Sequence, residues 1–293
     1  MKMNFKLKAL ALATVMAASV PALAAIEGGP TGNGELLLNV RYYGGTSATA
    51  GGDDISGLFD LGIRMNDFIA LNGQGGISKN WNLTQGAYAD AWNTVTSFVT
   101  SHGGTLNDIY FNVIALDSLN FNQPTYLTTF AGDVFPGLQN TNLRQFQGMQ
   151  TYVDANAGRG TIGTAADGAA TATPTDPTNS FFGAINGFGQ GDTWLQKTTA
   201  NTTQPLGTEQ NFWILNTSSL SNFGQVVKTP FGVDLNHDGS IAGNEFSKFT
   251  LNADGSLNFA SPVVSAIPEA DTWAMLLAGL GVLGAMVRRR AGA

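Results

Sequence analysis

The chain contains no cysteine and only two histidines among its 293 residues. Without cysteine there is no disulfide framework and no thiolate metal site, so stability must come from an apolar core or a bound ion. His102 and His237 lie far apart in the sequence and have no metal-ligand spacing with each other, which argues against zinc. No repeat of fixed period is present either, which disfavours solenoids and propellers.

Motifs for nucleophilic catalysis, zinc proteolysis and phosphate binding are also missing. Paired carboxylates for glycoside hydrolysis stay open, because such pairs meet only in space. The acidic candidates are Glu27, Glu35, Glu209, Glu245, Asp60, Asp67, Asp90, Asp117 and Asp192. Aromatic side chains that could stack on a sugar, or else lie in the core, are Tyr42, Tyr43, Trp81, Trp92, Trp194 and Trp213.

What is present begins with a secretory signal. Three lysines occur within the first eight residues, an apolar stretch runs from Ala9 to Val20, and small residues follow at Ala22 and Ala24. A basic start, a short apolar segment and an A-x-A site are typical of a signal peptide, here residues 1–24, cleaved after Ala24. We therefore expect passage through the secretion translocon and a mature chain outside the cytoplasm.

The other end is a second membrane-directed segment. Residues 272–287 carry no charge, and Arg288, Arg289 and Arg290 follow them. As a helix the uncharged run spans about 24 Å, which is short against roughly 30 Å of bilayer hydrocarbon. Each arginine would cost about 2.5–3.5 kcal/mol at the bilayer centre, so the cluster predicts a stop to transfer. We expect a transmembrane helix here.

Pro268, Glu269 and Ala270 precede this run, and the whole arrangement resembles the PEP-CTERM sorting signal of Gram-negative bacteria. The resemblance implies cleavage by an exosortase near the Pro-Glu pair. It also implies an inner-membrane-anchored precursor that ends at the cell surface or outside the cell. The third position is Ala270 where the family motif has proline.

Between the two end segments the body is acidic. Residues 25–266 keep eight lysines and arginines against nineteen aspartates and glutamates, a formal charge of −11. This balance disfavours nucleic acid and anionic lipid headgroups as partners, and it favours divalent cations or neutral polymers. The PEP-CTERM resemblance implies a setting in exopolysaccharide.

The hydrophobic pattern of the body predicts an α+β fold: a β-rich secreted domain of mostly antiparallel strands with two or so packed helices. Strands are expected at residues 35–43, 108–116, 211–216, 223–228 and 246–251, with a returning strand at 256–259. Helices are expected at 84–101, with Thr84 as N-cap, and at about 141–155.

Four parts follow from these elements and from composition: an N-terminal α+β part (25–157), a low-complexity loop or linker (158–179), a β-rich part (180–260), and the stalk and sorting tail (261–293). The strings Glu35–Leu38, Asp60–Ile63 and Tyr110–Val113 loosely resemble uncharacterised ectodomains that precede PEP-CTERM tails. That resemblance implies no particular activity.

One loop carries recognisable chemistry. Residues 234–245 match the twelve-residue calcium loop of EF-hand and dockerin-like proteins, with oxygen ligands expected from Asp234, Asn236, Asp238, Ser240 and Glu245. Gly239 permits the sharp turn, and Ala242 leaves position nine to water. The preceding residues do not look helical, so the pattern predicts one structural calcium ion on a β scaffold. The alternative is a polar turn that binds no metal.

Two functions remain open from sequence. The favoured one is a non-enzymatic surface or extracellular-matrix protein of the kind found in biofilms, tethered by its tail. The alternative is a surface-held extracellular hydrolase or glycan-binding protein.

Overall fold

The computed structural model describes residues 26–30, 32–44, 53–120, 122–145, 148–165, 167–176, 179–183, 202–264 and 270–291. The predicted signal peptide, including Ala22 and Ala24, lies outside the described residues. So do Pro268 and Glu269 of the sorting motif. Contacts divide the chain into a body that ends at Pro262 and a second unit from Val263 onward.

In the described part of the body, eleven strands form one antiparallel sheet with the curvature of a half-barrel. The path runs β3–β11–β10–β8–β5–β4–β1–β2–β6, while β7 pairs with β4 and β9 with β8. The strands are β1 (Glu35–Tyr43), β2 (Asp54–Arg64), β3 (Ser78–Asn82), β4 (Tyr110–Asp117), β5 (Thr125–Phe130), β6 (Ala169–Ala172), β7 (Gln204–Pro205), β8 (Gln210–Asn216), β9 (Val227–Phe231), β10 (Lys248–Leu251) and β11 (Ser256–Ala260).

Short helices accompany the sheet. The α-helices are α2 (Met65–Ile69), α3 (Ala89–Ser101), α4 (Asn140–Gln145), α5 (Gly148–Asn156) and, in the second unit, α6 (Ala270–Ala291). Single 3-10 turns are η1 (Gly86–Tyr88), η2 (Leu106–Asp108) and η3 (Gly243–Glu245).

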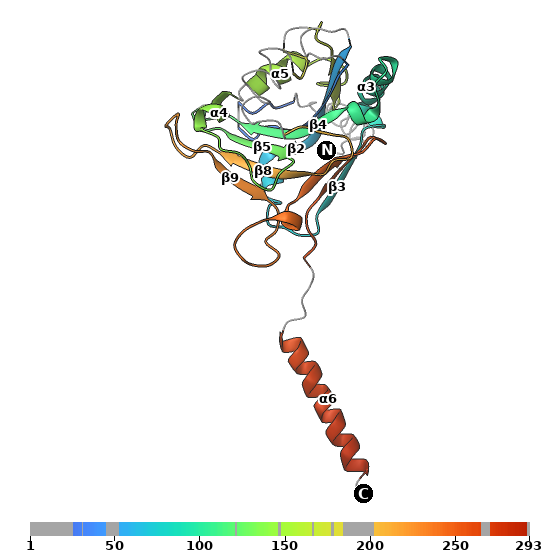
Figure 1. Cartoon of the computed structure of the whole chain (residues 1–293), viewed down its shortest axis with the longest axis vertical. Helices are drawn as coiled ribbons and strands as arrows, with labels where there is room; N and C mark the ends of the chain where they lie inside the picture. Colours follow the sequence, from blue (N-terminus) through green and yellow to red (C-terminus); the bar gives the residue numbers. More distant parts are fainter. Residues whose placement is uncertain are drawn as a thin grey trace, which may run out of the picture. The chain divides into compact units, whose positions relative to one another are not determined.

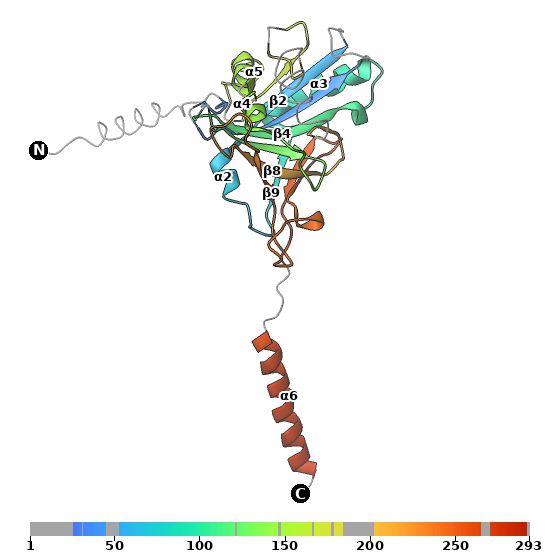
Figure 2. The same cartoon turned by 60° about the vertical axis from the view of Figure 1, so that its left-hand side comes forward.

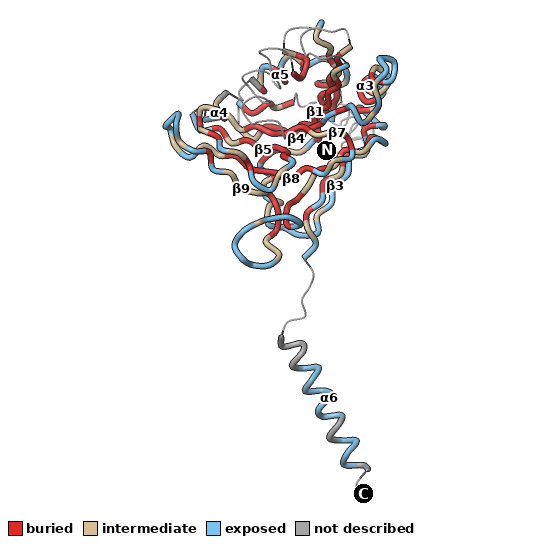
Figure 3. Tube along the Cα trace, viewed as in Figure 1, coloured by how far each residue is buried: buried red, intermediate tan, exposed pale blue. Residues whose placement is uncertain are grey.

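Strand β1 separates two apolar cores. Because side chains alternate along a strand, Leu36, Leu38 and Val40 enter one core and Leu37 enters the other. Helix α3 covers the first face with residues such as Val95, whereas α5 contributes to the second core on the opposite face (Figure 1). Figure 3 shows the central strands as almost continuously buried. The sheet is therefore covered on both faces.

The first core is unusually aromatic. Phe68, on α2, has its ring within 6 Å of four other phenylalanine rings contributed by β8, β9, β10 and β11: Phe212, Phe231, Phe249 and Phe259. Most of these pairs meet edge to face or tilted, the arrangement that the ring quadrupole favours. The side chain of Phe68 thus packs against residues from four strands.

The β-rich antiparallel class with a few helices is confirmed, and several element boundaries differ from expectation. The helix expected at 141–155 is two helices, α4 and α5. The helix expected from Thr84 begins as η1, and α3 has Tyr88 at its N-cap without a side-chain hydrogen bond. The strand expected at 223–228 lies at 227–231 as β9.

The segment 158–179 is more than a linker. Its residues Ala169–Ala172 form β6, which pairs with β2, and Ile162 is buried in the second core. This strand contains three small alanine side chains, which give little hydrophobic signal in the sequence. The described part of the segment therefore belongs to the sheet and its core.

Helix α6 contains the run expected to be helical at 272–287. Its described apolar side chains, from Met275 to Val287, are exposed. Among the residues that the structure describes, no helix combines the length and the apolar character required to cross a bilayer.

Replacement of Phe68 by alanine tests the aromatic core. Because the ring is fully buried among four others, Phe68→Ala should lower the free energy of unfolding by about 3–5 kcal/mol in chemical denaturation. The matched control is Phe223→Ala, since Phe223 is 77% exposed and should change stability by less than about 0.5 kcal/mol. Equal losses in the two variants would contradict the described packing.

Candidate functional sites

The loop predicted to bind calcium projects from the end of the sheet between β9 and β10 (orange, Figures 1 and 2; mostly exposed in Figure 3). Its base is fixed by pairing between Gly232 and Phe246 and by a hydrogen bond from the Val233 amide to the Glu245 carbonyl, 2.9 Å. The Gly232 amide also donates to Asn72 Oδ1 at 2.9 Å. The loop therefore starts and ends on rigid backbone.

Oxygens of the first three predicted ligands are drawn toward the inside of the loop. The Asp238 amide donates to both Asp234 Oδ1 (3.2 Å) and Asn236 Oδ1 (3.0 Å), so these two oxygens lie near one another. The Gly239 amide donates to Asp234 Oδ2 at 2.9 Å. Gly239 has a φ of 86°, a left-handed conformation that glycine adopts without strain.

Glu245 closes the loop from its far end. It is only 5% exposed, and its Oε1 accepts hydrogen bonds from the amides of Leu235 (3.0 Å) and Asn236 (3.2 Å). Its Oε2 accepts one from Ala242 at 3.1 Å. Three amide donors make the burial of this carboxylate tolerable without a cation.

Ser240 serves the loop through hydrogen bonds to Asp238. Its amide and its hydroxyl both donate to Asp238 Oδ1, at 2.8 and 2.6 Å. These hydrogen bonds, first that of the Ser240 hydroxyl, lower the pKa of Asp238.

The donor types and their order match the predicted calcium loop, but the three carboxylates are not gathered around one point. Within the described residues, no group of three or more His, Cys, Asp or Glu is arranged to hold a metal ion. Asp234, Asp238 and Glu245 are instead satisfied by backbone amides. An ion would have to draw the Glu245 carboxylate away from its amide partners.

A second cluster joins carboxylates at the start of β1 and the end of β2. Glu35 pairs with Arg64 and Leu37 with Asp60, with a register shift between these pairs. Asp60 and Glu35 are 1% and 8% exposed. Asp60 Oδ1 accepts a hydrogen bond from the Gly62 amide at 2.9 Å, and the Tyr88 hydroxyl donates to the Asp60 carbonyl.

Burial raises the pKa of Asp60 to about 7, and the negative charge of Glu35 adds to the effect. Asp167 raises it further, while the Gly62 amide and Arg64 oppose the shift. Burial also raises the pKa of Glu35. A hydrogen bond from the Glu27 amide, at 2.9 Å, and the charge of Arg64 act in the opposite direction and lower it. The cluster thus holds a proton near neutral pH.

This pair does not have the setting of a glycosidase. A polymeric substrate would need both carboxylates on the wall of a cleft, and these two are almost fully buried. In the sequence, Asp60 and Glu35 are two of nine acidic candidates, and nothing there pairs them. Their meeting depends on strand register, which the sequence does not display.

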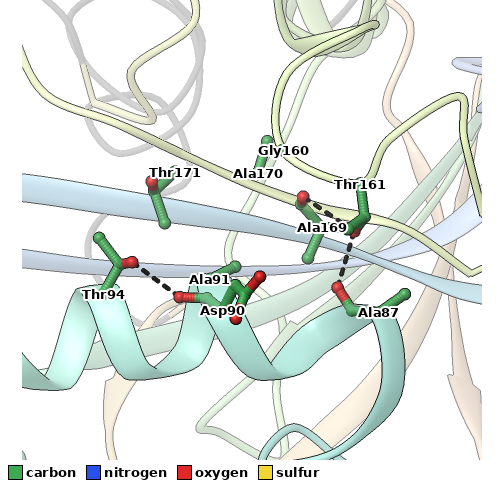
Figure 4. Close-up of a pocket in the computed structure, with 9 residues that line it drawn as sticks. All are labelled: Ala87, Asp90, Ala91, Thr94, Gly160, Thr161, Ala169, Ala170 and Thr171. Carbon is green, nitrogen blue, oxygen red and sulfur yellow. Dashed lines mark hydrogen bonds between the residues drawn. The ribbon is translucent and has the colours of Figure 1, made fainter.

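A groove of about 240 Å³ lies between α3 and β6 (Figure 4). The Thr161 hydroxyl crosses it to the Ala87 carbonyl at 2.7 Å, and the Thr94 hydroxyl donates to the Asp90 carbonyl, also at 2.7 Å. Among the described residues that line it, Asp90 alone is charged. With one carboxylate and small neutral neighbours, the groove lacks a hydrolytic pair.

The predicted stacking residues do not form an exposed platform in the described chain. Tyr42, Trp92 and Trp213 are buried, and Tyr43 and Trp81 are half-buried. Trp194 and Asp192 lie outside the described residues. The hydrolase and glycan-binding alternative gains no support from these side chains.

Comparison with known proteins identifies the tail. Residues 266–290 match the PEP-CTERM protein-sorting motif. No curated protein and no solved structure matches the chain. The motif supports export and sorting by an exosortase, while the predicted likeness of the body to other PEP-CTERM ectodomains stays a prediction.

Replacement of Asp60 by asparagine tests the carboxyl cluster. In the folded state Asp60 keeps its proton up to about pH 7, whereas the ordinary pKa is 3.8. The free energy of unfolding should therefore fall as pH rises from about 4 to about 7, by at most about 4 kcal/mol. Asp60→Asn should remove this dependence and raise the melting temperature at pH 8 but not at pH 4.

The control is Asp90→Asn, an exposed aspartate that should leave the pH dependence of melting unchanged. An identical slope of melting temperature against pH in the wild type and in Asp60→Asn would show that Asp60 does not hold the proton.

Proposed function

We propose that the protein is a non-enzymatic surface or extracellular-matrix component, held at the membrane as a precursor by its tail and processed there by an exosortase. The observation that carries this proposal is the match of residues 266–290 to the PEP-CTERM sorting motif. The predicted signal peptide also supports export, and the acidic body is consistent with a surface or matrix setting.

The second unit supports membrane engagement. Apolar side chains are exposed along α6 between Met275 and Val287, and Arg288 and Arg289 continue the helix. A helix that is apolar on every side is stable when lipid or protein covers it. The arginines carry fixed charge that lipid does not accept, and Trp273 suits an interface. The proposed anchor is this helix, with the arginines on the cytoplasmic side.

A structural calcium ion is the second part of the proposal. Asp234, Asn236 and Asp238 would supply side-chain oxygens, Ser240 its carbonyl, and Glu245 a carboxylate. Calcium would supply positive charge to a loop whose three carboxylates now rely on amide donors. Because Glu245 is buried beside the Gly232–Phe246 pairing, its binding to the ion would fix the loop to the ends of β9 and β10.

Calcium binding is tested by thermal unfolding of the full-length protein in a neutral detergent. A dissociation constant of roughly 10⁻⁴ to 10⁻³ M predicts about 1.4–2.7 kcal/mol of stabilisation at 10 mM calcium, or roughly 3–10 °C. Glu245→Gln should abolish the shift, and Asp234→Asn should weaken it. Glu209→Gln, an exposed glutamate outside the loop, should keep it. Absence of any shift in the wild type would remove calcium from the proposal.

The arginine stop is tested by fractionation with antibodies against body and tail in cells that lack the exosortase. Replacement of Arg288, Arg289 and Arg290 by glutamine should move precursor from the membrane to the soluble fraction, because no fixed charge then resists transfer. The lysine triple variant keeps the charge and should stay in the membrane. Retention of the glutamine variant would count against the stop.

A further inference from the structure

A buried arginine lies on the second face of the sheet, away from the loop and from the carboxyl cluster. Arg41, in β1, is 7% exposed. Its guanidinium donates from Nη1 to the Tyr43 hydroxyl at 3.0 Å and from Nη2 to Thr203 Oγ1 at 3.1 Å. Both acceptors are neutral, and Nε has no hydrogen-bond partner.

Within the described part of the chain no carboxylate forms an ion pair with Arg41; Asp54, which pairs with Tyr43, accepts a hydrogen bond from the Gly44 amide instead. The ion pairs there join Arg159 to Asp176 and Lys248 to Glu209. Burial lowers the pKa of Arg41, although an arginine remains protonated in proteins. A buried cation without a counter-charge is strongly unfavourable, and the usual compensation is an anion with good hydrogen-bond geometry.

Strand register places a second donor next to this guanidinium. Asn112 of β4 is paired with Asn39 of β1, and Arg41 is paired with Tyr110, so Arg41 and Asn112 are diagonal neighbours on one face. Thr203 precedes Gln204 of β7, and Gln204 pairs with Phe111 of β4. Because Arg41 lies in β1, on the other side of β4, its side chain extends across β4 to donate to Thr203. The guanidinium therefore passes over β4 beside Asn112.

Asn112 is also left with an unused donor. Its Oδ1 accepts a hydrogen bond from Asn39 Nδ2 at 3.0 Å, whereas its Nδ2 has no partner. Both side chains are fully buried. Two neighbouring buried groups thus each present an unpaired N–H, and both require an acceptor.

We propose that Arg41 and Asn112 form a binding site for a carboxylate group. The edge of the guanidinium made by Nε and the second N–H of Nη2 matches the two oxygens of a carboxylate, and Asn112 Nδ2 supplies a third donor. The rings of Tyr43 and Phe182 lie 4.8 and 5.8 Å from the Arg41 Cζ and screen the charge from water.

The site borders the surface at β4. Tyr110, the cross-strand partner of Arg41, is 40% exposed and Tyr43 is half-buried, so the site lies next to partly exposed side chains. Free carboxylates such as acetate and the carboxylate of an acidic sugar share this chemistry. The inference does not depend on the proposed sorting or on calcium.

The test is thermal unfolding of the full-length protein in a neutral detergent at pH 7.5, with equal concentrations of sodium acetate, sodium D-glucuronate or sodium chloride, and with D-glucose as neutral control. Carboxylate binding predicts a saturable rise in melting temperature, roughly 3–6 °C at ten times the dissociation constant. A rise with acetate and glucuronate identifies a site open to acidic sugars. A rise with acetate alone identifies a site for small free carboxylates. No rise, or an equal rise with chloride, overturns the proposal.

Substitutions test whether the rise in melting temperature with acetate arises at Arg41 and Asn112. Arg41→Gln should abolish it, whereas Arg159→Gln, which removes an arginine already paired with Asp176, should keep it. Asn112→Asp places a carboxylate beside Arg41 and keeps the acceptor for Asn39. It should raise the melting temperature without ligand and remove the response to acetate. If Arg41→Gln fails to fold, the acetate response of Asn112→Asp tests the proposal in its place. An unchanged acetate response in either folded variant overturns the proposal.

Discussion

The body depends on the burial of β1 from both sides. Consecutive residues of this strand enter different cores, so a single run of nine residues anchors α3 on one face and the α5 layer on the other. Its neighbours β2 and β4 continue both faces, and the sheet then curves through β5 and β8 to the phenylalanines around Phe68. A protein without disulfides can be stable with such a core.

The same two-sided burial explains where the chemistry lies. Several polar residues on the second face are almost fully buried, so each needs a hydrogen-bond partner or changes its protonation. Asp60 and Arg41 both lie on this face, at positions about 13 Å apart along the strands, too far to neutralise each other. The aspartate responds by holding its proton near neutral pH. The arginine cannot release its proton in this way, so its charge calls for an external anion. The loop predicted to bind calcium contrasts with both, since it projects from the sheet and its carboxylates accept hydrogen bonds from its own amides.

The sequence predicts those elements in which side-chain pattern and burial agree. Strand β1 coincides with its expected residues because Leu, Val and Tyr dominate it and Gly44 ends it, and the hairpin of β10 and β11 follows its Asn-Ala-Asp-Gly turn. Strands β3 and β6 escape prediction because serine, asparagine and alanine give no strand signal. Their pairing with β11 and β2 is imposed by the sheet. The predicted calcium ligands follow from spacing in one loop, whereas Asp60 with Glu35 and Arg41 with Asn112 are brought near each other only by strand register. The tail is the most predictable part, since its motif is contiguous.

Hydrogen–deuterium exchange of the exported protein, resolved by peptide, tests the two-sided sheet most directly. Backbone amides of β1 and β4 should exchange slowest of all, with rates set by global unfolding and unaffected by calcium, while the amides of 234–245 exchange faster. Exchange of β1 as fast as that of the exposed loop, with slow exchange confined to β10 and β11, would contradict a body organised around β1.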